Sequence, residues 1–238
     1  MTAPHFEPRP QAAKAAPIGF VNAPRVHQAL TAGIEKRLLI WLARHTPEAI
    51  GPDHLTTLGL AAQIAAGVAY ALVAHDPRAL WLVNLLLILN WLGDSLDGTL
   101  ARVRNQQRPR YGFYVDHISD TFGALALMAG LAFSGLVHWP IAAGLLVCYY
   151  ALSIETYLAT YTLGRFHLSH GMLGPTEIRI LLAVGNIVAY WHPYSEILGH
   201  RYLLFDVGGC VAIASMAVMF LIVSVQHTAA LYRAETVR

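Results

Sequence analysis

The sequence predicts an all-α integral membrane protein with six transmembrane helices, preceded by an amphipathic helix that lies in the membrane interface. Three observations lead to this fold class. Only 13% of the 238 residues are charged and 56% are hydrophobic, whereas soluble chains carry roughly 25% charged residues. Long apolar segments recur along the chain, and one earlier segment combines apolar and basic residues at helical spacing. Much of the surface is therefore expected to face lipid.

Six segments are long and apolar enough to cross a bilayer. They lie near residues 51–75, 79–103, 112–137, 139–164, 175–193 and 203–231. A helix of about 25 residues is about 37 Å long, against a hydrocarbon core of about 30 Å. The segments run apolar without the strict alternation of barrel strands, so they are predicted as helices.

The chain before these spans divides into two parts. Residues 1–23 are rich in Pro and Ala and are predicted as a flexible tail. From Pro24 to Ile50, apolar residues recur at helical spacing beside basic ones, which is typical of an interfacial amphipathic helix. The apolar positions are Val26, Leu30, Ile34, Leu38 and Leu42. The alternative is an ordinary helix that packs on the membrane domain, which we place at residues 51–238.

The basic residues predict the orientation of the spans. With the N-terminus in the cytoplasm, an even number of spans returns the C-terminus there. The cytoplasmic segments then hold Arg25, Lys36, Arg37, Arg44, Arg102, Arg104, Arg108, Arg110, Arg165, Arg179, Arg233 and Arg238, and the other face holds only Arg78 and Arg201. This asymmetry follows the positive-inside rule. The net charge of +2 gives no reason to expect nucleic-acid binding.

Four carboxylates lie within two adjacent spans. Asp94 and Asp97 share one face of the second span, and Asp116 and Asp120 share one face of the third. The two helices are joined by a short loop, so we expect them to be antiparallel neighbours whose carboxylates converge near the cytoplasmic side. Like charges in lipid need protonation or a bound cation. Oxygen ligands suit Mg²⁺, Mn²⁺ or Ca²⁺.

Small and basic residues accompany the carboxylates. Gly98 leaves a bare patch of helix where a phosphate or base approaches the backbone, and Ala101 keeps this patch low. Arg102, one turn beyond Gly98, is placed to contact phosphate. Gly112 opens the third span opposite the patch. Close helix packing is the alternative role of the small residues.

These residues form a string that resembles the signature of the CDP-alcohol phosphatidyltransferase family. The string reads Asp94-x-x-Asp97-Gly98-x-x-Ala101-Arg102, nine residues, then Gly112-x-x-x-Asp116-x-x-x-Asp120. Six membrane helices with this motif across the second and third are the family's layout. The resemblance therefore covers most of the chain.

The resemblance implies a reaction, cofactors and an assembly. Asp94, Asp97, Asp116 and Asp120 would bind two divalent ions, Mg²⁺ or Mn²⁺, while Gly98, Ala101, Arg102 and Gly112 would line the CDP site. An acceptor alcohol, lipid or polar, would attack the β-phosphorus of a CDP-alcohol donor and release CMP, with Asp120 as candidate base. The family forms homodimers. The small residues Gly123, Ala126, Gly130 and Gly144 would serve either such a contact or packing within one protomer.

Two local strings favour one branch of the family. His117 stands beside Asp116, and Gly174-Pro175-Thr176-Glu177 opens the fifth span. Both resemble the choline and ethanolamine phosphotransferases, which join a CDP-amino-alcohol to diacylglycerol. In that branch His117 and Glu177 would act as a catalytic base pair. The structural alternatives are a hydrogen bond from His117 to a metal-binding carboxylate and a helix-terminal role for Glu177.

Other readings remain open. The competing branch uses CDP-diacylglycerol and a soluble acceptor such as glycerol phosphate, inositol phosphate or serine, and Arg165 or Arg179 would then hold an acceptor phosphate. Glu155 would recognise an amino group or pair with Arg179. His167 and His170 are spaced like metal ligands, but we expect solvated loop residues there. A cation transporter is a remote alternative, because the acids crowd towards one face and no repeat is visible.

Overall fold

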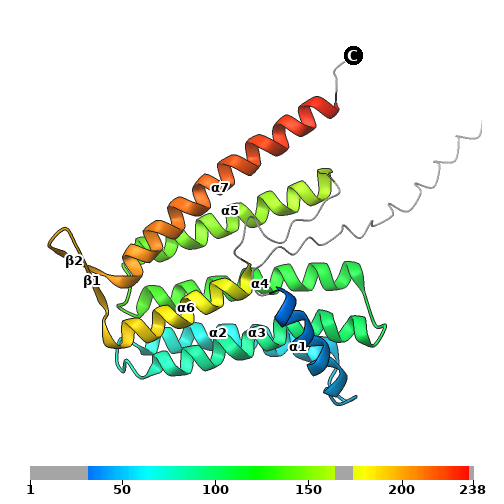
Figure 1. Cartoon of the computed structure of the whole chain (residues 1–238), viewed down its shortest axis with the longest axis horizontal. Helices are drawn as coiled ribbons and strands as arrows, with labels where there is room; N and C mark the ends of the chain where they lie inside the picture. The colour runs from blue at the N-terminus through cyan, green and yellow to red at the C-terminus, as the bar shows by residue number, and fades with distance from the viewer. Residues whose placement is uncertain (1–31, 164–173, 236–238) are drawn as a thin grey trace, which may run out of the picture.

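The described part of the protein is helical except for one short hairpin (Figure 1). A computed structural model describes residues 32–163 and 174–235. The elements in chain order are α1 (Ala32–His45), α2 (Pro52–Leu72), α3 (Ala79–Val103), α4 (Pro109–Phe133), α5 (Trp139–Leu163), α6 (Pro175–Trp191), β1 (Tyr194–Ile197), β2 (His200–Leu203) and α7 (Leu204–Ala234). Each of the six predicted spans coincides with one helix from α2 to α7.

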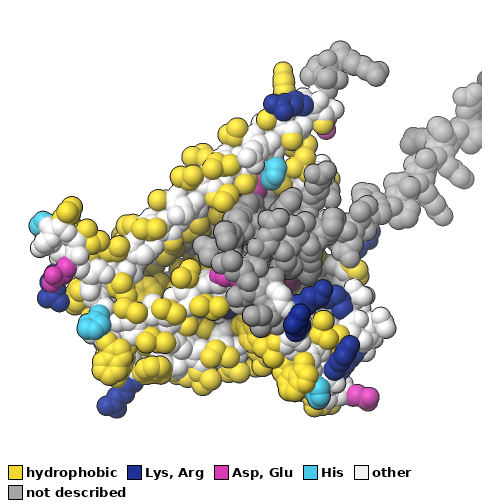
Figure 2. Space-filling view, viewed as in Figure 1, with side chains coloured by type: hydrophobic (Ala, Val, Ile, Leu, Met, Phe, Trp, Pro, Cys, Tyr) yellow, Lys and Arg dark blue, Asp and Glu magenta, His cyan; other side chains and the backbone are white. Residues whose placement is uncertain are grey.

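Four of these helices are long and apolar enough to cross a membrane, namely α2, α3, α5 and α7. α4 is 25 residues long but carries Asp116 and Asp120. α6 has 17 residues, or about 26 Å, which is slightly less than a hydrocarbon core. In Figure 2 the visible face is mainly hydrophobic along the helices, as expected of a protein in lipid. The crossing of all six helices stays a prediction.

Glycines bring α2 into close contact with both neighbouring helices of the motif. A Cβ added at Gly93 of α3 would lie 2.5 Å from the backbone N of Gly59, and one at Gly130 of α4 would lie 1.8 Å from the carbonyl O of Gly67. α2 therefore packs tightly along α3 and along α4. The prediction that the two motif helices pack directly on each other is wrong, since α2 lies between them. We call this contact zone the α2 seam.

The small residues predicted for either dimer contact or internal packing pack within the protomer. A Cβ at Gly123 would lie 2.1 Å from Oε1 of Gln63, and one at Gly67 would lie 2.2 Å from the carbonyl O of Ala126. Gly144 lies against Ile213 of α7, with 2.9 Å between an added Cβ and Cδ1. The close approach of the helices accounts for the small size of these residues.

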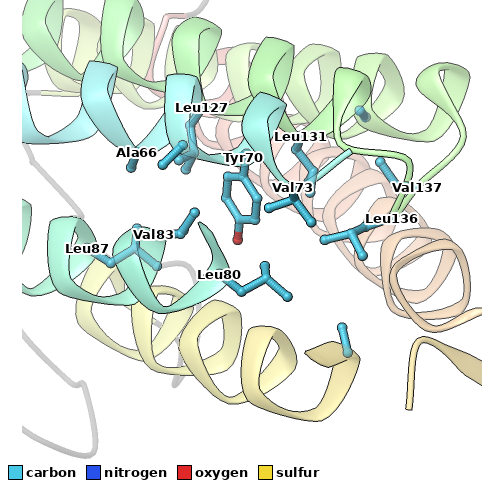
Figure 3. Close-up of a cluster of buried hydrophobic side chains, with 13 residues drawn as sticks. Ala66, Tyr70, Val73, Leu80, Val83, Leu87, Leu127, Leu131, Leu136 and Val137 are labelled. Carbon is cyan, nitrogen blue, oxygen red and sulfur yellow. The ribbon is translucent and has the colours of Figure 1, made fainter. Parts of the chain in front are cut away.

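The main hydrophobic core lies at the ends of α2, α3 and α4 that are farthest from the motif. Tyr70 is fully buried there among Leu80, Val83, Leu131 and other apolar side chains (Figure 3). Its hydroxyl donates to Oδ1 of Asn186, 2.8 Å away. Asn186 in turn donates to Oδ1 of Asn84 over 2.7 Å. This buried polar chain fastens α6 to α2 and α3.

α1 lies across the end of α3 that carries the motif. Leu39 and Ala43 are buried against Leu96 and Leu100, while the side chain of Trp41 is 56% exposed. The helix thus packs on the domain with one face and offers apolar surface on another. Residues 1–31, which include the predicted tail and the predicted helix positions Val26 and Leu30, lie outside the described residues.

The hairpin between α6 and α7 was not predicted from the sequence. β1 pairs antiparallel with β2, and Ile197 faces His200 across a two-residue turn. Leu198 and Gly199 both have positive φ, at 52° and 79°, as a type I′ turn requires. Leu198 is an unusual residue for this conformation. That explains why no turn signal was visible in the sequence.

Candidate active site

A small cavity lies over α2 between the two motif helices. Its lining combines carboxylates with other polar side chains. The lining residues are Thr56, Gly59, Leu60 and Gln63 of α2, Asn90 and Asp94 of α3, and Asp116, Ser119 and Asp120 of α4. The α2 seam positions them, because Gly59 lets α3 approach closely at Gly93, the residue before Asp94. Three of the four predicted metal-binding carboxylates thus share one cavity.

α6 places a guanidinium against two of the residues that line this cavity. Arg179 donates from Nη2 to Oδ2 of Asp94 over 2.6 Å and from Nε to Oδ1 of Asn90 over 2.7 Å. Its Nη1 is buried and has no hydrogen-bond partner among the described residues. The pair lies in a poorly hydrated region, since 14% of the Arg179 side chain and 25% of the Asp94 side chain are exposed. Arg179 therefore has a buried Nη1 group, with two N–H donors, left for further acceptor atoms.

The remaining carboxylates have contrasting surroundings. Asp97 accepts a 2.5 Å hydrogen bond from Oγ1 of Thr56 on α2 and a short one from the amide of Gly98. Asp120 is half-buried and interacts electrostatically with Asp94, Asp116 and Arg179. The four acids therefore form one electrostatic group, although two are on α3 and two on α4.

The residues agree with the implied divalent metal in their chemistry and location. Carboxylate oxygens are the ligands that Mg²⁺ prefers, and three of the Asp side chains line the same cavity. Within residues 32–163 and 174–235, however, no three acidic, His or Cys side chains converge closely enough to hold an ion. Arg179 instead compensates the charge of Asp94. An ion held by Asp94 would share the carboxylate with Arg179.

The predicted CDP-binding residues form an open patch at the motif end of α3 and α4. A Cβ added at Gly112 would meet nothing within 4 Å, and one at Gly98 would meet only Nη1 of Arg102, 3.5 Å away. Packing therefore does not explain these glycines. Arg102 curls back along α3 and donates to Oγ1 of Thr99 over 2.9 Å. Ala101, on the same turn, is half-buried.

The loops next to this patch are held by arginines. Arg104 donates to the carbonyl oxygens of Thr46 and Ile50, each over 2.7 Å, and so fastens the connection from α1 to α2 onto the end of α3. Arg108 forms an ion pair with Asp53. This hydrogen bond raises the pKa of the exposed Arg108 guanidinium. Both arginines fix the start of α2 beside the motif.

The two residues proposed as a base pair have contacts on their own helices. Nδ1 of His117 lies 2.6 Å from the carbonyl O of Phe113, and its ring packs on Phe113 and Tyr157. Glu177 is buried, and its Oε2 accepts a 3.0 Å hydrogen bond from the amide of Gly174. Glu177 thus caps the first turn of α6.

Glu155 contacts a histidine of α7, and the predicted pairing with Arg179 is not formed. It is buried on α5, and its Oε1 lies 2.5 Å from Nδ1 of His227 on α7. Arg179, one of its predicted partners, pairs with Asp94 instead. Glu155 therefore fastens α5 to α7. Arg165, His167 and His170, which the sequence analysis also considered, lie outside the described residues.

Several polar residues of the site were missed by the sequence analysis. Asn90 lies one turn before Asp94, is buried, and donates to the carbonyl O of Gly59 over 3.0 Å. Thr56 and Gln63 of α2 line the cavity with it. Their signal in the sequence was present: polar residues at 56 and 63 and at 90 and 94 recur at helical spacing within apolar runs.

Comparisons with known proteins agree with the geometry. The model of the CDP-alcohol phosphatidyltransferase family matches residues 49–223. A similar solved structure is the phosphatidylinositol phosphate synthase of Mycobacterium tuberculosis with CDP-DAG bound. It is 22% identical, with a TM-score of 0.56, over 81% of this chain and 92% of that chain. No curated protein is significantly similar in sequence. The match covers about three quarters of the chain, and the chain therefore belongs to the CDP-alcohol phosphatidyltransferase family.

Proposed function

We propose that the enzyme transfers a phosphatidyl group from CDP-diacylglycerol to a soluble alcohol that carries a phosphate, and releases CMP. The observation that carries this proposal is Arg179. Its guanidinium lies against Asp94 beside the carboxylate cavity, and the two N–H donors of its buried Nη1 are unused by the described residues. A guanidinium suits phosphate because its planar fork matches two phosphate oxygens. Of the acceptors considered from the sequence, glycerol phosphate and inositol phosphate carry such a group, and serine does not.

The similar solved structure supports the donor half of the proposal. That synthase has CDP-DAG bound, and its likeness extends over most of this chain. The open patch around Gly98 and Gly112 offers uncovered backbone next to Arg102, where the nucleotide phosphates would lie. The two acyl chains would remain in the bilayer beside the helices. CDP-diacylglycerol thus replaces, as the proposed donor, the CDP-amino-alcohol that the sequence around His117 and Glu177 favoured.

The proposed chemistry is a single displacement at phosphorus. The acceptor hydroxyl oxygen forms a bond to the β-phosphorus, and the bond from that phosphorus to the bridging oxygen breaks. The bridging oxygen leaves with CMP and keeps the electron pair. Asp120 takes the hydroxyl proton, since it lines the cavity beside Asp94 and Asp116. Arg179 holds the acceptor phosphate and thereby orients the hydroxyl.

The four motif carboxylates would hold the implied cofactors. Asp94, Asp97, Asp116 and Asp120 supply oxygen ligands from two helices that α2 keeps in register. Divalent ions bound there would neutralise the pyrophosphate and favour in-line displacement. In this proposal Arg179 shares Asp94 with the ions.

The transfer of an amino-alcohol phosphate to diacylglycerol is the second candidate. One observation favours it. The carbonyl of Phe113 accepts from Nδ1 of His117, which fixes the tautomer and makes Nε2 the basic nitrogen. A lipid hydroxyl could use this nitrogen as its base. Glu177, the proposed partner, already caps α6 at Gly174, so a structural role accounts for its position.

An assay of CMP release tests the proposal. Purified enzyme with Mg²⁺ or Mn²⁺ receives CDP-diacylglycerol, CDP-choline or CDP-ethanolamine, each with glycerol phosphate, inositol phosphate, serine or diacylglycerol. We expect turnover with CDP-diacylglycerol and a phosphorylated acceptor. Arg179→Ala should raise the KM for that acceptor at least tenfold, because a charge-assisted hydrogen bond is lost. The matched control is Arg78→Ala, at the opposite end of α3.

Two outcomes would contradict the proposal. Turnover of CDP-choline or CDP-ethanolamine with diacylglycerol, and none with CDP-diacylglycerol, would establish the second candidate. An unchanged acceptor KM in a folded Arg179→Ala enzyme would remove the observation on which the choice of acceptor depends.

The orientation and assembly of the enzyme are proposed on separate grounds. The positive-inside asymmetry places both termini and the carboxylate cavity on the cytoplasmic side, where soluble phosphorylated acceptors and CMP occur. The homodimer rests on the family alone. Its interface would use apolar surface that the protomer leaves exposed, such as Val225 and Leu221 of α7.

A further inference from the structure

One carboxylate oxygen of α1 joins three helices next to the candidate site. Oε1 of Glu35 accepts hydrogen bonds from Nε1 of Trp91 over 2.8 Å and from Oγ1 of Thr176 over 2.9 Å. Oγ of Ser95 lies 3.4 Å from the same oxygen. Trp91 and Ser95 belong to α3, and Thr176 opens α6. Glu35 of α1 therefore connects α3 to α6.

The same two helices form the Asp94–Arg179 ion pair. On α3, Trp91 and Ser95 lie three residues before and one residue after Asp94. On α6, Thr176 lies three residues before Arg179, which is one helical turn. The contacts of Glu35 and the Asp94–Arg179 ion pair thus connect the same turns of α3 and α6 at two separate points. A shift of α6 relative to α3 at the Glu35 contact therefore changes the position of Arg179.

α1 is held firmly enough to serve as a fixed support. Leu39 and Ala43 are buried on α3, and Arg104 fastens the chain that follows α1 through the carbonyls of Thr46 and Ile50. Glu35 lies towards the other end of α1. Its position is therefore set from α3, and what it adds is the hydrogen bond to α6.

We propose that Glu35 is a positioning residue for acceptor binding: it fixes the first turn of α6 against α3, and so sets where Arg179 presents its unused Nη1 group to the acceptor phosphate. The inference rests on the proposed function only in naming the acceptor. It also gives Thr176 a role within the Gly174-Pro175-Thr176-Glu177 string, since Thr176 docks the helix end that Glu177 caps.

Kinetics of Glu35 variants test the inference. Glu35→Ala removes all three hydrogen bonds, and we expect the KM for the phosphorylated acceptor to rise about tenfold. The KM for CDP-diacylglycerol should change less than about twofold, because the donor patch lies on α3 and α4. Glu35→Gln keeps an oxygen that accepts hydrogen bonds, so it should restore most of the acceptor affinity. Thr176→Val should raise the acceptor KM by a smaller factor than Glu35→Ala.

The matched control is Glu48→Ala, an exposed glutamate in the connection from α1 to α2, which should behave like the wild type. Equal effects of Glu35→Ala on donor and acceptor KM would overturn the inference, because they would indicate a general loss of structure. Failure of Glu35→Gln to restore affinity would also overturn it, since a charge at position 35 would then be what matters.

Hydrogen exchange gives a readout that does not depend on the substrate. The amides of Gly174, Ile178 and Arg179, at the start of α6, should exchange at least several times faster in Glu35→Ala than in the wild type or Glu48→Ala. Unchanged exchange there would overturn the positioning role. If Arg179→Ala leaves the acceptor KM unchanged while exchange at α6 still responds to Glu35→Ala, the acceptor assignment fails and the docking role of Glu35 stands.

Discussion

The α2 seam and the open patch of the motif are both built from glycine, but for different reasons. At the seam, a Cβ on Gly93 or Gly130 would collide with the backbone of α2 at 2.5 Å or less. At the patch, a Cβ on Gly112 would meet open space, and one on Gly98 would be in ordinary contact with Arg102. The protein's own packing requires the first pair of glycines and leaves the second pair unexplained.

This difference separates folding from binding at neighbouring positions. Small residues in membrane helices usually permit helix contact, and that explanation suffices for the seam. Where it does not hold, a ligand that approaches the backbone is the remaining reason for a glycine. The comparison predicts that substitutions at the seam reduce stability, whereas substitutions at the patch reduce donor binding in a protein that still folds.

The largest effect is expected at the seam. In Gly130→Ala the new methyl group would lie 1.8 Å from the carbonyl O of Gly67, so α2 and α4 must separate. We expect a loss of about 3 kcal/mol or more in the free energy of unfolding, measured by thermal unfolding in detergent. Gly112→Ala is the matched control and should unfold like the wild type. Equal stability of the two variants would break the comparison.

A carboxylate between the two glycine regions should affect turnover without unfolding. Asp116→Asn keeps the shape of the side chain but removes the charge that a hard cation needs. We expect CMP release to fall more than about 100-fold, which exceeds the usual cost of losing an outer partner of a metal ligand. Chelation by EDTA should have the same effect, and added Mg²⁺ or Mn²⁺ should reverse it. Chelator-resistant turnover would contradict the metal assignment.

Substitution at the open patch should weaken binding of the CDP-alcohol donor. Gly98→Val places two methyl groups on the bare surface beside Arg102, and we expect the KM for the CDP-alcohol to rise roughly tenfold or more. The thermal unfolding temperature of Gly98→Val should be close to that of Gly112→Ala. An unchanged donor KM in this variant would show that the nucleotide lies elsewhere.

The smallest effect is expected at His117. If Asp120 is the base, His117→Ala loses the contact with Phe113 and some ring packing, and the rate should fall less than about tenfold. A positioned general base would be worth roughly 10²–10⁴. A loss of that size, with donor KM unchanged, would favour the lipid-hydroxyl mechanism over the proposed one.

Most of the helical layout could be predicted from the sequence, because apolar length is a local property. The hairpin could not, since its turn places Leu198 at a positive φ without an Asn or Gly at that position. The order of packing was also mispredicted. A short loop between two helices indicates that they are antiparallel, but it does not show that α2 fits between them. That follows from pairs of glycines such as Gly59 and Gly93, which are 34 positions apart in the chain.

The site was predictable where spacing along one helix was enough. Asp94, Asp116 and Asp120 line one cavity, as expected from two pairs at helical spacing. Partners from other helices were harder to predict. Arg179 reaches Asp94 across 85 positions, and Glu35 reaches Thr176 across 141. For Glu177 the local string left a catalytic and a helix-terminal role open, and the hydrogen bond from the amide of Gly174 three residues earlier fits the second.

The Asp94–Arg179 pair has a consequence for synthesis of the chain. Asp94 is synthesised 85 residues before Arg179. At about 5–20 residues per second, the Asp94 carboxylate is therefore without its guanidinium partner for roughly 4 to 17 s. During that interval α3 is already able to enter the bilayer. An unpaired carboxylate in lipid is costly, so we expect protonation or a bound cation to lower this cost until α6 is made. The order of synthesis therefore predicts that insertion of α3 responds to pH or to divalent ions.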